Sequence, residues 1–100
     1  MSKVITATTA TRTDFPVGKV ALTTWNGTEY RIDNETVAVL FDNEGNVCDL
    51  ASNFGTAMSH VRDGQGVAVA LQGDSFGGTV EDVQAQFDTA REHYVDCFGI

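Results

Sequence analysis

Positive charge is what this sequence of 100 residues lacks most. Six Lys and Arg residues stand against 14 Asp and Glu residues, which gives a formal net charge of −8. From residue 29 onward the imbalance sharpens, because thirteen acids face only Arg31, Arg62 and Arg91. A body with this charge repels nucleic acid and anionic membranes and attracts basic proteins. The alternative is that the acidic surface serves only solubility.

Long apolar runs are also absent. No stretch of 18 apolar residues occurs, so no membrane-spanning helix is expected. Residues 1–15 lack the apolar stretch of a secretory signal peptide, and we therefore expect a cytoplasmic protein. Cysteine is scarce, and in a reducing compartment Cys48 and Cys97 are expected to be free thiols.

The hydrophobic content is sufficient for one core. With 42% hydrophobic and 20% charged residues, the chain has the composition of a globular protein. Its length fits a single domain over residues 1–100. Residues 1–14, rich in Thr and Ala, are either a frayed arm or an edge strand.

The clearest local signal is a β-hairpin. Asn26-Gly27 lies between two β-rich segments, and both positions of a two-residue turn need positive φ, which these residues tolerate. The turn sets the register, and three cross-strand pairs then share the apolar face of the hairpin. These pairs are Trp25 with Thr28, Thr23 with Tyr30, and Ala21 with Ile32.

Three further strands are expected. Residues 35–42 form a strand whose unbroken apolar run, 37–41, indicates a central position in a sheet. A turn follows at 42–45, then a short strand at Val47 and Cys48. Residues 66–72 have the composition of a buried strand.

Two helices are expected. Asp49 is the predicted N-cap of the first, and Gly64 its predicted C-terminal stop. The second covers roughly 80–97. Apolar residues recur at helical spacing in both: Leu50, Phe54, Ala57, Met58 and Val61 in the first, and Val80, Val83, Phe87, Ala90 and Tyr94 in the second.

The order of these elements predicts an α+β fold. A small, mainly antiparallel sheet of three to five strands begins with the N-terminal hairpin, and two helices pack on one of its faces.

The stretch "QGDSFGGTV" (72–80) raises the question of a phosphate-binding loop, because glycines here precede a helix. It has no lysine and no established glycine pattern, and Asp74, Glu81 and Asp82 would repel an anion. A local interpretation is better: Thr79 is the N-cap, and Asp82 completes an approximate capping box. We expect no cofactor here.

Catalytic arrangements are poorly supported. His60 and His93 are each followed three positions later by an Asp, which permits a metal site, a base with its orienting carboxylate, or plain solvent-facing ion pairs. Both histidines are predicted on the polar sides of their helices, and no four-ligand zinc set can be assembled. Cys48 and Cys97 each adjoin an aspartate, which opposes thiolate formation. We therefore expect neither catalysis nor a metal site.

Asp88, Glu92 and Asp96 break a local rule. Their spacing of i, i+4 and i+8 stacks like charges on one helix face, at a cost of about 0.2–0.5 kcal/mol per pair. Such violations often mark functional surfaces, and a row of carboxylates can stand in for phosphates. A solvated face without a partner is the alternative.

These observations lead to one hypothesis and two alternatives. The hypothesis is a non-enzymatic protein that binds and blocks a basic, nucleic-acid-handling protein, with no direct contact to nucleic acid or membrane. In size and charge the chain resembles the small acidic proteins that bacteriophages use against host defences, including anti-restriction and anti-CRISPR proteins; no motif carries the resemblance. The alternatives are an assembly module or homodimeric subunit that pairs through its sheet near Leu22, and a small hydrolase or metal-binding protein that uses His60 or His93. The residues expected to bind the basic partner are Asp88, Glu92, Asp96, Glu81, Asp82, Asp42, Glu44 and Asp49.

Overall fold

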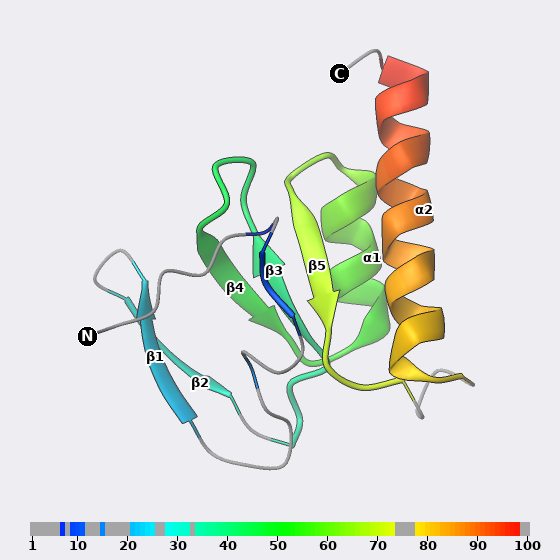
Figure 1. Ribbon diagram of the computed structural model, residues 1–100. Coiled ribbons are helices and arrows are strands. Elements are labelled where there is room, and N and C mark those ends of the chain that lie inside the picture. Colours follow the sequence, from blue (N-terminus) through cyan, green and yellow to red (C-terminus); the bar gives the residue numbers. More distant parts are fainter. Residues whose placement is uncertain are drawn as a thin grey trace.

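The computed structural model in Figure 1 describes residues 7, 9–11, 15, 21–25, 28–32, 34–73 and 78–98, without the side chains of 21–29 and 94–98. The chain folds as an α+β protein, as expected. The strands β1 and β2 form an antiparallel hairpin, and β4, β3 and β5 form a second antiparallel sheet in that order. The elements are β1 (Ala21–Trp25), β2 (Thr28–Ile32), β3 (Ala38–Phe41), β4 (Val47–Ala51), α1 (Phe54–Arg62), β5 (Val67–Ala70) and α2 (Val80–Phe98).

Strand β3 lies at the centre of the three-stranded sheet, as its apolar run predicted. Its four residues are all buried, because both faces of the strand are covered. Ala38 and Leu40 face the two helices, whereas Val39 and Phe41 face the opposite side of the sheet. Because successive side chains of a strand point to opposite faces, β3 contributes to two separate apolar clusters.

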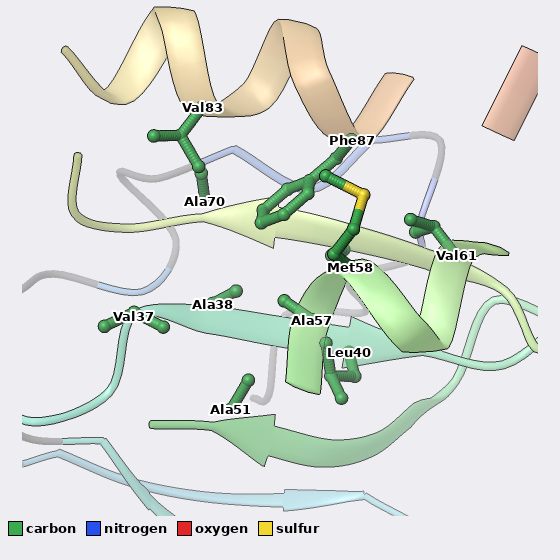
Figure 2. Packing of buried hydrophobic residues seen from close by; sticks show 11 residues of the cluster. Val37, Ala38, Leu40, Ala51, Ala57, Met58, Val61, Ala70, Val83 and Phe87 are labelled. Carbon is green, nitrogen blue, oxygen red and sulfur yellow. The ribbon is translucent and has the colours of Figure 1, made fainter. Parts of the chain in front are cut away.

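Both helices pack on one face of this sheet (Figure 1). Figure 2 shows the helix-side cluster, in which Met58 of α1 and Phe87 of α2 meet above the strands. The ring of Phe87 also stacks on Phe54, with centroids 5.5 Å apart. The helix-side cluster consists of Val37, Ala38, Leu40, Ala51, Ala57, Met58, Val61, Ala68, Ala70, Val83 and Phe87.

The other face of the sheet carries the second cluster. Phe15 is buried there and meets Phe41 edge to face, with ring centroids 6.2 Å apart. Most of residues 1–14 lie outside the described part of the chain, but Ala7 and Ala10 pack against this cluster. The buried members are Phe15, Ile32, Val39, Phe41, Val47, Val69 and Leu71.

The hairpin has the predicted register. Trp25 pairs with Thr28, and Thr23 pairs with Tyr30. Tyr30 is half-buried, and its hydroxyl donates to the carbonyl of Val47 at 3.5 Å, so that β2 is tied to β4. The Asn26-Gly27 turn and the side chains of Trp25 and Leu22 are outside what the structure describes.

The start of α1 corrects the prediction of Asp49 as its N-cap. The helix begins at Phe54, and Asn53 is the cap, with its Oδ1 accepting from the Thr56 N–H at 2.8 Å. Asp49 and Leu50 instead belong to β4, where Leu50 pairs with Val39. Leu50 stands four residues before Phe54, a spacing that fits a helix, but strand pairing lets it pack on the opposite cluster.

The ends of the helices otherwise follow the sequence. Helix α1 ends at Arg62, and Gly64 follows with φ 69°. Helix α2 opens with the expected capping box: the Thr79 N–H donates to Asp82 Oδ2 at 3.0 Å, and the Asp82 N–H donates to Thr79 Oγ1 at 3.2 Å. In the described part of the chain, neither helix is long and apolar enough to span a bilayer.

Candidate functional site

Three carboxylates form a line along α2. Glu81, Asp88 and Glu92 are all exposed, and their spacing of seven and four residues puts them on one side of the helix. We call these three residues the α2 acidic stripe. Asp96 continues the line along the backbone, but its side chain lies outside the described part. Asp82 does not belong to the stripe, because it follows Glu81 directly and therefore lies about 100° further around the helix. Its carboxylate is engaged in the capping box.

The stripe runs beside the outer edge of β5. Gln84 lies between the stripe and the strand, and its Nε2 donates to Asp88 Oδ1 at 3.1 Å. Glu81 and Asp88 also border a groove of about 520 Å³, which Ala7 and Ala10 line as well. The guanidinium of Arg91 is bonded to the backbone just before β5, because its Nη1 donates to the Gly66 carbonyl at 2.7 Å.

The acids of the turn between β3 and β4 play a different part. Asp42 holds the turn together, because its Oδ1 accepts from the backbone N–H groups of Glu44 at 2.9 Å and Asn46 at 3.0 Å. Glu44 is exposed. The turn is attached to α2 by Arg91, whose Nη1 donates to Asn43 Oδ1 at 3.3 Å.

Asp49 lies at the other edge of the sheet. It is exposed on β4, whereas the stripe lies beside β5, and β3 separates these two strands. Asp49 borders a groove between β4 and α1 that it shares with Cys48 and His60. The acids predicted to bind a partner therefore do not form one surface.

His60 corrects the prediction that both histidines lie on polar helix faces. Its side chain is only 6% exposed, and its Nε2 lies 2.6 Å from the carbonyl oxygen of Phe41. Helix α1 is turned so that Ala57, His60 and Val61 all face inward. The hydrogen bond to the carbonyl compensates for burying a polar ring. Its position three residues after Ala57 was the signal in the sequence that pointed to this inward face.

His93 remains exposed and borders a different groove, between α1 and α2, together with Met58 and Arg62. The two histidines therefore do not share a site. Among the described residues, no group of three or more His, Cys, Asp or Glu side chains is arranged to hold a metal ion.

The surroundings of Cys48 favour its thiol form. Loss of surrounding water raises the pKa of Cys48, and the carboxylates of Asp42 and Asp49 raise it further. A nucleophilic cysteine needs the opposite environment, one that favours the thiolate. The side chain of Cys97 lies outside the described residues.

Comparison of the chain with protein-family models, with curated proteins and with solved structures gives no match.

Proposed function

We propose that this protein is a non-enzymatic acidic binding protein that blocks a basic, nucleic-acid-handling protein. The observation that carries the proposal is the α2 acidic stripe, in which three exposed carboxylates follow one side of a helix in a chain of net charge −8. On this proposal the protein acts in the cytoplasm, where it meets the protein that it blocks.

The stripe has a geometry suited to a cationic surface. Seven residues of helix separate Glu81 from Asp88 by about 10 Å, and four separate Asp88 from Glu92 by about 6 Å. Lysine and arginine side chains that normally contact successive phosphates could then each meet a carboxylate. Once these basic side chains are paired with carboxylates, the nucleic acid can no longer bind them. The protein therefore competes with nucleic acid for the same surface of its partner.

Attraction between the acidic protein and its basic partner would supply most of the binding free energy of such an interface. An isolated exposed ion pair contributes only about 0–1 kcal/mol, so several pairs must act together. The net negative charge also accelerates encounter with a basic partner, and this steering weakens as salt screens the charges. Steep salt dependence is therefore an expected property of the complex.

The proposal is tested by displacement of nucleic acid. A fluorescently labelled DNA or RNA duplex is bound to each of a panel of nucleic-acid-binding proteins, and its release by this protein is followed by anisotropy. We expect release from at least one panel member. The effect should weaken strongly between about 50 mM and about 200 mM salt.

Two double variants that change the net charge equally test whether the α2 acidic stripe is the binding surface. Asp88→Lys combined with Glu92→Lys should weaken displacement by about tenfold or more. The matched control, Glu35→Lys combined with Asp63→Lys, changes exposed acids away from the stripe and should leave displacement nearly unchanged. Equal losses in both would show that net charge alone matters, and failure to displace from every panel member would refute the proposal.

A further inference from the structure

The groove between β4 and α1 has a chemical character of its own. It has a volume of about 750 Å³, which is within the range of about 300–1,000 Å³ typical of small-ligand sites. Hydroxyl, thiol, amide, imidazole and carboxylate groups surround it, and no Lys or Arg side chain lines it. Its polar lining comes from Cys48, Asp49, Asn53, Thr56, Ser59, His60 and Gln65.

His60 lines this groove, and its hydrogen bond determines which ring nitrogen can act as an acceptor. Its Nε2 lies 2.6 Å from the Phe41 carbonyl oxygen, which can only accept, so Nε2 carries the proton. In the neutral ring, Nδ1 then has a free lone pair. Because Nε2 is engaged by Phe41, Nδ1 is left as the ring nitrogen available to a ligand in the groove that His60 lines.

Asp49 adds a charged acceptor on the β4 side of the same groove. Its Oδ1 accepts from the Leu50 N–H at 2.8 Å, and its carboxylate is exposed. Cys48 lines the same groove, and its pKa is raised by loss of surrounding water and then by the carboxylates of Asp42 and Asp49. The ring of His60 and the carboxylate of Asp49 thus border one concave site.

A ligand for this site must be rich in donors and positively charged. Guanidinium fits, because it offers five N–H donors in a planar fork, has no acceptor and keeps its charge. A lysine ammonium is a compact, strongly hydrated point charge, and it matches two separated acceptors less well. An anion would meet the lone pair of His60 and the carboxylate of Asp49, and both would repel it.

We propose that this groove binds an arginine side chain of a protein partner, with the guanidinium donating to His60 Nδ1 and to the Asp49 carboxylate. The inference rests on the proposed function for the source of the arginine, since a basic partner supplies it. The groove and the α2 acidic stripe lie at opposite edges of the sheet, so the two surfaces can be tested separately.

The test uses a blocked arginine, Nα-acetylarginine N-methylamide, and the intact chain labelled with ¹⁵N. We expect the unbound protein to show His60 protonated at Nε2 and not at Nδ1. Addition of the probe should then shift the Nδ1 resonance and the amide signals of Asp49 and Thr56 saturably, with a dissociation constant on the order of 1 mM. Blocked citrulline, which has the same shape without the charge, should give no saturable shift, and blocked lysine should bind more weakly.

Variants complete the design. Asp49→Asn should weaken arginine binding by about tenfold, while the control Asp63→Asn should leave it unchanged. The double variant Asp88→Lys, Glu92→Lys should still bind the probe, which separates this site from the stripe. The substitution His60→Gln would remove a buried hydrogen bond and could detach α1 from the sheet. The role of His60 is therefore measured from the Nδ1 resonance of the unsubstituted protein. A proton on Nδ1 in the unbound protein, equal binding of citrulline, or equal affinities of the two Asp→Asn variants would overturn the inference.

Discussion

The side-chain amide of Gln84 pairs with the backbone of Ala70 in the way a neighbouring strand would. Gln84 Oε1 accepts from the Ala70 N–H at 2.8 Å, and its Nε2 donates to the Ala68 carbonyl at 2.9 Å. Arg91 continues this cover along β5 through its hydrogen bond to Gly66. Helix α2 thus satisfies backbone groups that would otherwise invite another strand. This cover opposes pairing of two copies through β5.

Removal of that amide is the first prediction. Gln84→Ala leaves the Ala70 donor and the Ala68 acceptor without their partner, and we expect unfolding to become easier by about 1–3 kcal/mol. Urea denaturation measures the change. The control is Gln86→Ala, at an exposed position on the same helix, which should change stability by about 0.5 kcal/mol or less. If both variants are equally stable, the β5 edge does not depend on Gln84. Size-exclusion chromatography should also show more self-association for Gln84→Ala.

Two glycines should respond in opposite directions to alanine. Gly66 has φ 151°, and a Cβ there would overlap the carbonyl oxygen of Phe41. We expect Gly66→Ala to destabilise the fold by well over about 1 kcal/mol. Gly55 is an exposed residue within α1, where a Cβ would only touch Asn53 Oδ1 at 3.4 Å. Gly55→Ala should therefore stabilise the protein by about 0.5–1 kcal/mol, and thermal denaturation of the pair compares them.

The capping box makes a third prediction. Thr79→Ala removes the hydroxyl that accepts from the Asp82 N–H, and we expect a loss of about 0.5–2 kcal/mol. Thr89→Ala is the control, because Thr89 is exposed in the interior of α2 and alanine has the higher helix propensity. Chemical denaturation should therefore rank the three proteins with Thr89→Ala at least as stable as the wild type. A neutral Thr79→Ala would contradict the role of the cap.

The thiol of Cys48 yields a prediction on pH. Its pKa is raised by loss of water and by Asp42 and Asp49, so at a given pH less thiolate is present than in the unfolded chain. In a Cys97→Ala background, alkylation by iodoacetamide should be slower in the folded than in the unfolded protein, with a midpoint above the ordinary thiol value. Asp49→Asn should lower that midpoint, and Asp63→Asn should not.

The same pKa shift has a consequence for stability. Because the folded state keeps the Cys48 proton after the unfolded state has lost it, the free energy of unfolding should fall as pH rises above the ordinary thiol pKa. Tyr30 acts in the same direction at higher pH, since loss of water and the charges of Cys48 and Asp49 raise its pKa. Denaturation at a series of alkaline pH values would show this decline, and Cys48→Ser should reduce its first part.

The fold could be predicted from the sequence where a signal was local or periodic. The Asn26-Gly27 dipeptide set the strand register, because turn geometry determines which residues face each other. The apolar run of β3 indicated a central strand, and β3 lies between β4 and β5. Thr79 and Asp82 formed the expected cap, because both partners lie within one turn of helix.

The candidate site was less accessible to sequence reasoning. The spacing of Leu50 and Phe54 fits a helix as well as a strand followed by a helix, and only pairing with Val39 decides between them. The same displacement moved Asp49 from a helix cap to a strand edge, where it faces the groove of His60. The burial of His60 depends on Phe41, nineteen residues earlier in the chain, and no local pattern encodes that contact.

The sequence by itself determined the acidic charge, the register of the hairpin, the caps and the line of carboxylates along α2, since each follows from composition or from neighbours within a few residues. Only the tertiary structure decided that the acids divide between the α2 side of β5, the turn between β3 and β4, and the β4 edge. It alone also decided that α2 covers the outer edge of β5, and that the ring of His60 bonds to a carbonyl nineteen residues earlier in the chain. These features arise from apolar side chains being removed from water by partners distant in the chain. The orientation of each helix against the sheet, and therefore the surface that it presents, is set by that burial.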